Sequence, residues 1–164
     1  MSVKKLVAMG LLTAIGTLAG VFSIPVAGAL IFPVQHAINV LAAVLLGPGP
    51  AVLVAFAVAL LRNLLGTGTV LAFPGGMIGA FVAGYAFRLF KRDYAAAVGE
   101  VLGTGFLGAL AAVPLARLVL GSEAIAFALV IPFATSSLAG AVLGLVVLKG
   151  VAVAVPKQLG EEGK

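Results

Sequence analysis

The chain has 164 residues, of which 63% are hydrophobic and 9% are charged, and its formal net charge is +5. A soluble domain has about a quarter of its residues charged, and a chain of this length has too little interior to bury so much apolar surface. A soluble fold is therefore excluded, and we predict an all-α integral membrane protein. With no cysteine, one histidine and five scattered carboxylates, the chain has no thiolate chemistry, and we expect no metal or other cofactor.

Six apolar segments approach the length of about 20 residues that a membrane-spanning helix needs. The first is expected at 6–23, where Pro25 and Gly28 follow and break it. The second begins at Pro33, since proline suits the first position of a helix, and ends at the turn Gly47–Pro50. The remaining four are expected at 51–65, 74–90, 95–115 and 124–148.

Basic residues indicate how these segments cross the membrane. With six crossings and both termini in the cytoplasm, eight of the ten basic residues fall on the cytoplasmic side and only Arg62 and Arg117 fall outside. Cytoplasmic loops have this excess of positive charge. The second and third segments are short, so charge alone leaves a re-entrant hairpin open. We expect a multi-pass protein of the cell membrane with one transmembrane domain, 1–156, and a short cytoplasmic tail, 157–164.

Uncharged polar side chains collect near the predicted outer ends of the segments. Gln35 and Asn39 are four residues apart and His36 and Asn39 are three apart, so each pair can share a helix face. Polar groups inside a membrane are costly and tend to be functional. We predict a pocket for a small, mostly neutral ring compound with a ring nitrogen and a hydroxyl; helix capping or headgroup contact is the alternative. Thr135 and Ser136 are expected near mid-depth of the sixth segment, where Pro132 interrupts it. The predicted binding residues are Gln35, His36, Asn39, Arg62, Asn63, Thr67, Thr69, Thr135 and Ser136.

Two loops on the same side are expected to line or cover this pocket. The stretch LGTGTVLAFPGG at 65–76 is rich in glycine, which permits tight turns, but it lacks the lysine and the spacing of a phosphate-binding P-loop. No P-loop occurs elsewhere, so the chain does not hydrolyse ATP by that route. The apolar loop 23–32 is the candidate for an opposing lid. Ordinary turn geometry is the alternative for both loops.

Small residues recur at four-residue spacing on the first segment, and one carboxylate lies within the fifth. Gly10 and Ala14 are four residues apart on the first segment, as are Gly16 and Gly20, and such pairs let helices approach closely. They can pack the bundle itself or dock a partner. Glu100 lies near the predicted inner end of the fifth segment, where we expect it to pair with the basic residues of the preceding loop.

Two stretches resemble a known family. FPVQHAINVLAAVLLGP at 32–48 and LLRNLLGTGTVLAFPGGMIGA at 60–80 are similar to the ThiW family, the thiazole-specific substrate-binding subunit (S component) of energy-coupling factor (ECF) transporters. The resemblance implies a bundle of six helices, both ends cytoplasmic, that captures hydroxyethylthiazole, a thiamine precursor. A transmembrane coupling subunit and two ATPase subunits would drive uptake, so the chain itself would not be an enzyme.

The resemblance also bears on particular positions. It makes the polar residues of the two stretches the candidates for substrate binding, and it implies docking of the coupling subunit on the first helix, at Gly10 and Ala14, where the family often has two alanines. The family pattern has serine where this chain has Gly76, so a hydroxyl contact there is absent.

Two other functions remain open from the residues alone. A self-sufficient secondary transporter commonly buries ionisable groups for ion coupling, and the sequence places no carboxylate clearly at mid-membrane. An intramembrane enzyme would need a nucleophile next to a base, for which Ser136 and His36 are the candidates. These two residues are predicted at different depths, which argues against the enzyme.

Overall fold

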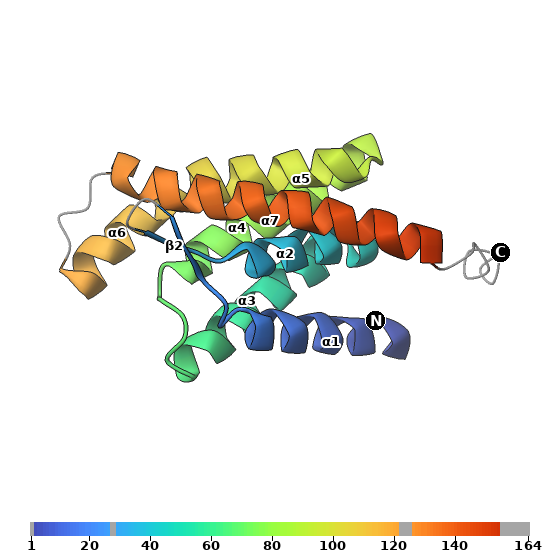
Figure 1. Ribbon diagram of the computed structural model, residues 1–164, viewed down its shortest axis with the longest axis horizontal. Coiled ribbons are helices and arrows are strands. Elements are labelled where there is room, and N and C mark those ends of the chain that lie inside the picture. Colours follow the sequence, from blue (N-terminus) through green and yellow to red (C-terminus); the bar gives the residue numbers. More distant parts are fainter. Residues whose placement is uncertain (1, 27–28, 122–125, 155–164) are drawn as a thin grey trace.

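The computed structural model describes residues 2–26, 29–121 and 126–154, and the predicted tail, 157–164, lies outside them. Helices form almost all of this part of the chain, with one short antiparallel hairpin between the first two helices (Figure 1). The elements are α1 (Val3–Ala19), β1 (Ile24–Val26), β2 (Ala29–Ile31), α2 (Pro33–Leu46), α3 (Pro48–Leu64), α4 (Ala72–Phe90), α5 (Asp93–Leu102), the π-helical segment η1 (Gly103–Gly108), α6 (Ala109–Leu120) and α7 (Ala126–Ala154).

Local sequence explains where the first helices begin and end. The Ser2 side chain caps α1 by accepting a hydrogen bond from the Lys5 amide at 3.3 Å. The helix ends at Ala19, before the predicted limit of 23, and residues 20–23 form a turn that leads into the hairpin. Gly47 joins α2 to α3 with φ of +88°, a value that glycine tolerates best, and Pro48 begins α3.

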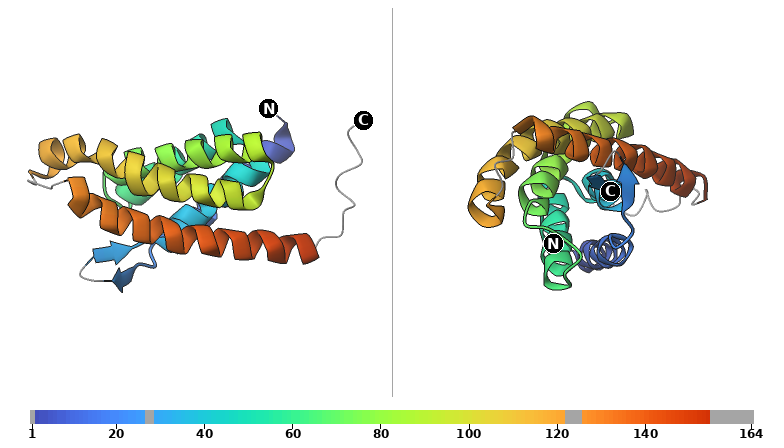
Figure 2. Two further views of the ribbon diagram at one scale, coloured as in Figure 1. Left: turned by 90° about the horizontal axis from the view of Figure 1, so that it is seen from above. Right: turned by 60° about the vertical axis from the view of Figure 1, so that its left-hand side comes forward.

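Helix α2 lies at the centre of the bundle, in contact with α1, α3, α4, α5 and α7 (Figure 2). Eleven of its 14 residues are buried. At 1.5 Å per residue the helix is about 21 Å long, shorter than the roughly 30 Å hydrocarbon core of a bilayer. Because other helices surround it, α2 does not itself need to reach both membrane surfaces.

The bundle has two distinct ends. The start of α1, the connection between α4 and α5, and the end of α7 lie together at one end, whereas the hairpin, α6 and the loop after α3 lie at the other (Figures 1 and 2). The first end carries the basic residues of those elements, namely Lys4, Lys5, Arg88, Lys91, Arg92 and Lys149. The second end carries Arg62 at the end of α3 and Arg117 near the end of α6.

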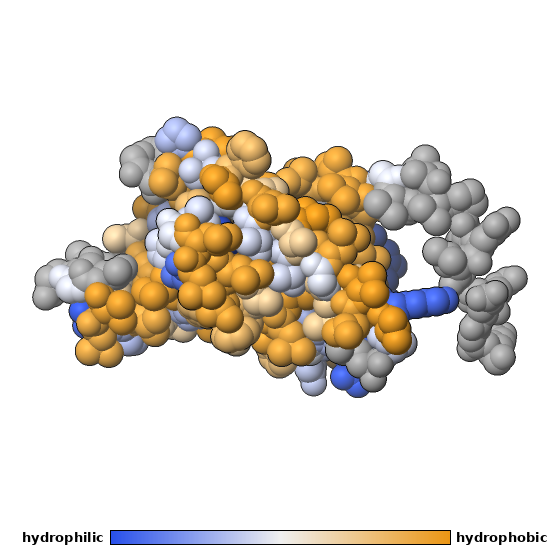
Figure 3. All heavy atoms as spheres, turned by 90° about the horizontal axis from the view of Figure 1, so that it is seen from below, coloured by the Kyte–Doolittle hydropathy of each residue, from blue (hydrophilic) through white to orange (hydrophobic). Residues whose placement is uncertain are grey.

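The outer surface of the bundle is apolar. Hydrophobic residues cover most of the face in Figure 3, and large side chains such as Leu18, Leu89 and Val146 are well exposed. Three helical stretches are long and apolar enough to cross a membrane: Ala72–Phe90, Asp93–Val119 and Ala128–Gly150. The helices α2 and α3 are apolar but shorter. A lipid environment accounts for this surface; the number of crossings stays a prediction.

Helix α4 approaches the start of α3 through a glycine. A Cβ at Gly84 would lie 2.5 Å from the Pro48 Cα atom and 2.8 Å from its nitrogen, so a side chain there would push backbone apart. We expect Gly84→Ala to lower the free energy of unfolding by about 1–3 kcal/mol, measured by thermal unfolding in detergent. Gly150→Ala is the control, since nothing lies within 4 Å of a Cβ there. Equal melting temperatures for both variants would contradict this packing.

Candidate functional site

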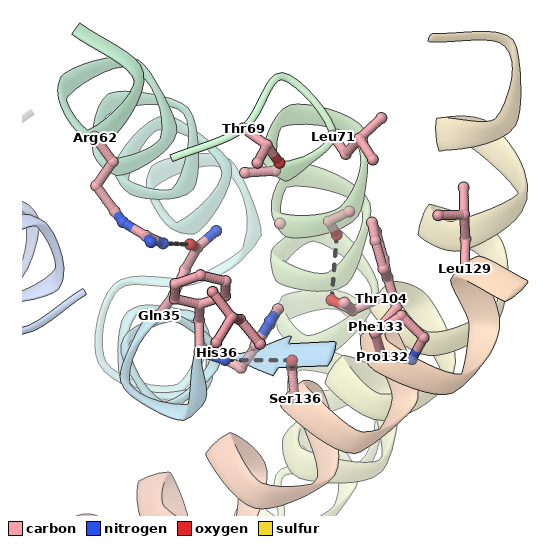
Figure 4. A pocket seen from close by; sticks show the side chains of 15 residues that line it. Gln35, His36, Arg62, Thr69, Leu71, Thr104, Leu129, Pro132, Phe133 and Ser136 are labelled. Atoms are coloured by element: carbon pink, nitrogen blue, oxygen red, sulfur yellow. Dashed lines mark hydrogen bonds between the residues drawn. The ribbon is translucent and has the colours of Figure 1, made fainter. Parts of the chain in front are cut away.

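A cavity of about 370 Å³ lies at the end of the bundle that carries the hairpin and the loop after α3 (Figure 4). Gln35 and Arg62 lie on one side of it, and Thr104, Phe133 and Ser136 lie on the other. The lining residues are Leu30, Phe32, Gln35, His36, Arg62, Thr69, Leu71, Ala72, Gly75, Gly76, Thr104, Leu129, Pro132, Phe133 and Ser136. The wall is thus mostly apolar with a few polar groups, as in sites for small organic ligands.

Helix α2 brings three predicted polar residues to this region. Pro33 occupies the first helical position, so Gln35 and His36 follow in the first turns, and both line the cavity. Asn39 lies one turn further along and is 1% exposed. It does not line the cavity but bonds groups behind it: its Nδ2 donates to the Gly76 carbonyl oxygen at 3.1 Å and to Glu100 Oε1 at 3.0 Å.

Glu100 on α5 is the centre of a buried hydrogen-bond network. Its side chain is fully buried, and its Oε1 lies 2.8 Å from His36 Nδ1, 3.0 Å from Asn39 Nδ2 and 2.9 Å from Thr104 Oγ1. The Thr104 hydroxyl has one proton, so it donates either to Glu100 or to the Gly75 carbonyl oxygen at 3.2 Å. The network therefore joins α2, α4, α5 and η1 behind the cavity.

A glycine on α4 makes room for this carboxylate. A Cβ at Gly79 would lie 2.7 Å from Glu100 Oε2 and would also collide with the Thr104 hydroxyl. Glu100 Oε2 itself is buried and has no hydrogen-bond partner among the described residues. Thr104 belongs to the π-helical segment η1, and such segments are frequent at functional sites.

Arg62 is the second buried ionisable residue of the site. It is 2% exposed, and its Nη1 donates to Gln35 Oε1 while its Nη2 donates to the Thr67 carbonyl oxygen at 2.8 Å. Its guanidinium carbon lies 4.5 Å from the centre of the Phe32 ring, a cation–π contact. Within the described residues the only acid–base pair is His36 with Glu100, so Arg62 has no carboxylate partner there. Arg62 thus holds α2, the loop after α3 and the residue that follows the hairpin.

The other predicted binding residues occupy different places. Thr69 and Ser136 line the cavity, and Ser136 Oγ accepts a hydrogen bond from the Phe32 amide at 3.3 Å. Asn63 donates to the Ala59 and Thr69 carbonyl oxygens, and the Thr67 hydroxyl donates to the Arg62 carbonyl oxygen, so both hold the loop in place. Thr135 donates to the Ile131 carbonyl oxygen of its own helix. Contact of any of these residues with a ligand stays a prediction.

The two loops predicted beside the pocket lie beside the cavity. Leu30 of the hairpin and Phe32 immediately after it line one part, and Thr69 and Leu71 of the loop after α3 line another. Asn63 and Arg62 fasten this second loop through its backbone oxygens. The hairpin was not predicted, because its strands have three residues each and the sequence offers only a proline and a glycine as turn signals.

Two expectations from the sequence are wrong. Glu100 does not pair with the basic residues of the preceding loop; it is buried against His36, Asn39 and Thr104, because Gly79 leaves space for it. The bundle therefore does contain a buried carboxylate, and the argument against a secondary transporter loses this support. The signal for this in the sequence was a single carboxylate within an apolar segment, because a carboxylate inside a membrane is costly unless other groups bond to it.

The second correction concerns His36 and Ser136. They were predicted at different depths, yet both line the same cavity. No hydrogen bond joins them in the described part of the chain; His36 bonds Glu100, and Ser136 accepts from the Phe32 amide. A nucleophile activated by a base requires such a bond. Nor do the described residues contain a group of three or more histidine, cysteine, aspartate or glutamate side chains that could hold a metal ion.

The predicted docking residues lie on the outside of α1. Gly10 and Ala14 are exposed, and nothing lies within 4 Å of a Cβ built on Gly10. Gly16 and Gly20 instead face the bundle: a Cβ at Gly16 would lie 2.9 Å from the Val58 side chain, and one at Gly20 would lie 2.8 Å from the Arg62 side chain. Gly10 and Ala14 thus lie on the exposed face of α1, and Gly16 and Gly20 lie on the face that packs against the bundle.

Comparison with known proteins identifies the family. Residues 6–154 match the family model described as thiamine-precursor transporter protein (ThiW). The chain belongs to the ThiW family. No curated protein and no solved structure matches it significantly. Membership in the ThiW family makes the chain a thiamine-precursor transporter protein and accounts for its apolar surface and membrane-length helices.

ThiW membership also bears on the cavity. A transporter for a thiamine precursor needs a site for a small organic molecule, and the cavity among α2, α3, α4, η1 and α7 has the size and the mixed polar and apolar wall of such a site. An enzymatic role has no comparable support, because the ThiW family is a transporter family.

Proposed function

We propose that the chain is the substrate-binding subunit of an ECF importer and that it captures hydroxyethylthiazole in this cavity from the outer face of the cell membrane. The observation that carries the proposal is the cavity itself: a compact, mostly apolar space with Gln35 and His36 on its wall and a ThiW-family sequence around it. A single substituted ring with one ring nitrogen and one hydroxyl matches such a wall in size and polarity.

The distribution of charge supports the orientation. Six described basic residues lie at the end with the start of α1 and the end of α7, and Arg62 and Arg117 lie at the cavity end. Since positive charge favours the cytoplasmic side, the cavity faces outward and both termini face inward. The sequence contains no P-loop, so in this proposal ATP hydrolysis and energy coupling belong to partner subunits. The exposed face of α1 at Gly10 and Ala14 is the proposed docking surface for the coupling subunit.

The test is a calorimetric titration of the purified protein in detergent with hydroxyethylthiazole. We expect saturable binding and a rise in melting temperature, since a ligand that binds only the folded state stabilises it. Thiamine and the aminopyrimidine half of thiamine are the comparison ligands. Binding of either one without binding of hydroxyethylthiazole would reject the substrate, and binding of none of the three would reject the proposed capture role.

A self-sufficient secondary transporter is the second candidate, and the buried Glu100–His36 pair is the observation that favours it. The two candidates differ in uptake. Proteoliposomes that contain only this chain should bind hydroxyethylthiazole without accumulating it if partner subunits provide the drive. Accumulation that depends on a proton or sodium gradient would instead establish the secondary transporter.

A further inference from the structure

Each of the two polar side chains on the α2 wall of the cavity is held by a buried ionisable residue, of which Arg62 itself lines the cavity and Glu100 lies behind it. Arg62 holds Gln35, and Glu100 holds His36. The holding residues are 2% and 0% exposed, so these contacts are shielded from water. The chemistry of the holding residues determines which atom of Gln35 and of His36 is left for a ligand.

For Gln35 the remaining atom is a donor. An arginine side chain has donors and no acceptor, so only the amide oxygen of Gln35 can face it. Gln35 Oε1 accepts from Arg62 Nη1, and Gln35 Nε2 therefore points away from Arg62. It lies beside α4, since a Cβ at Gly76 would be 3.1 Å from it, and Gly76 lines the cavity. No hydrogen bond involves Nε2 in the described residues.

For His36 the remaining atom is an acceptor. Asn39 Nδ2 contacts both the Gly76 carbonyl oxygen and Glu100 Oε1, and a backbone carbonyl can only accept, so the Asn39 nitrogen is correctly placed as a donor. Glu100 Oε1 consequently accepts from Asn39, and His36 Nδ1 lies 2.8 Å from the same oxygen. We assign the ring proton of a neutral His36 to Nδ1, where this oxygen can accept it. In an imidazole with one proton, Nε2 is then an unprotonated acceptor.

We propose that the cavity presents one fixed donor, Gln35 Nε2, and one fixed acceptor, His36 Nε2, and that it selects ring compounds that carry one acceptor atom and one hydroxyl donor. Glu100 and Arg62 are the positioning residues. The proposal rests on the proposed function and deepens it: the ring nitrogen of the ligand accepts from Gln35, and its hydroxyl donates to His36. A compound that lacks either group leaves a desolvated polar atom unpaired and binds less tightly.

The experiment compares the dissociation constants of three ligands by calorimetry. They are hydroxyethylthiazole, its ethyl counterpart, which lacks the hydroxyl, and its thiophene counterpart, in which CH replaces the ring nitrogen. We expect each counterpart to bind the unmodified protein about ten-fold more weakly or worse. His36→Phe should abolish the preference for the hydroxyl and keep the preference for the ring nitrogen. Gln35→Met should do the reverse.

The positioning role of Glu100 has its own test. Glu100→Leu removes the acceptor that holds His36, so it should lose the preference for the hydroxyl as His36→Phe does. Glu100→Gln keeps an acceptor oxygen and should retain the preference. Ser137→Ala is the control, because Ser137 is fully buried on α7, donates to the Ala134 carbonyl oxygen and does not line the cavity. It should leave both preferences unchanged.

The outcomes separate this inference from the proposed function. Failure of the unmodified protein to bind any of the three ligands rejects the proposed function. Binding of all three with equal affinity, or retention of both preferences in His36→Phe and Gln35→Met, overturns the donor and acceptor assignment. Folded Glu100→Leu that keeps the preference for the hydroxyl overturns the positioning role, and if this variant does not fold, the His36 and Gln35 variants still decide the assignment.

Discussion

Methionine in place of Arg62 is expected to weaken binding of hydroxyethylthiazole by about 100-fold, because truncation of a buried, hydrogen-bonded charge costs several kcal/mol. The change removes the donor that orients Gln35, the hydrogen bond to the Thr67 carbonyl oxygen and the stacking against Phe32. All three contacts hold parts of the cavity wall or of the loop beside it. Calorimetric titration of the purified variant measures the effect.

Two variants make this result specific. Arg62→Lys should recover only part of the affinity, since the single nitrogen of an ammonium group cannot replace the two guanidinium nitrogens that reach Gln35 and Thr67, nor the flat stacking on Phe32. Arg117→Met removes the same charge from the same end of the bundle, but Arg117 is exposed near the end of α6. It should bind the ligand normally. If Arg62→Met bound as tightly as Arg117→Met, the role assigned to Arg62 would be lost.

The second large effect is expected at Glu100. Glu100→Leu should lower the free energy of unfolding by about 3 kcal/mol, the order found when one partner of a buried pair is removed. His36 Nδ1 loses its acceptor altogether, whereas Asn39 and Thr104 retain the carbonyl oxygens of Gly76 and Gly75. Unfolding by heat in detergent, followed by circular dichroism, measures the change.

The controls for Glu100 are on the same helix. Glu100→Gln keeps the side-chain shape and an acceptor oxygen, so most of the stability should remain. Asp93→Asn removes an exposed carboxylate from the first turn of α5, where a negative charge is worth about 0.3–1 kcal/mol through the helix dipole. A loss at Asp93 as large as that at Glu100 would show that general charge effects, and not the buried network, decide stability.

Much of the helical architecture was accessible from the sequence because its signals are local. Apolar runs of membrane length, Pro33 at a helix start and Gly47 in a tight turn depend on neighbouring residues only, and the helices α2, α3 and α4 lie close to the predicted limits. The family was accessible for a similar reason, since two continuous stretches carry the resemblance and the family match spans residues 6–154.

Which residues share the cavity could be predicted only in part from the sequence. Gln35 and His36 were placed at a pocket from their chemistry, and both line the cavity. The same reasoning could not separate them from Asn39, which lies behind the wall. That distinction depends on which face of α2 meets α4 and α5, and therefore on packing between segments far apart in the chain.

The position of Glu100 was even less predictable from the sequence, because it depends on residues far away along the chain. Its partners His36 and Asn39 are 64 and 61 residues away along the chain. Nearby basic residues made a local pairing the simplest expectation from the sequence. The space for the carboxylate comes from a glycine on another helix, Gly79, and only the three-dimensional arrangement reveals that it is there.

The wide turn of η1 has a consequence for the long rod that α5, η1 and α6 form. Buried residues recur along this rod at intervals of four, at Ala96, Glu100, Thr104, Gly108, Ala112 and Ala116. In a regular α-helix each such interval overshoots a full turn by about 40°, so the row would wind around to the lipid side. A π-helical stretch holds more residues per turn and offsets part of that rotation. Small or polar residues that recur every four positions in an otherwise apolar helix therefore indicate such a π-helical stretch. Deletion of one residue from 103–108 would rotate α6 relative to α5 and turn its buried residues away from the neighbouring helices.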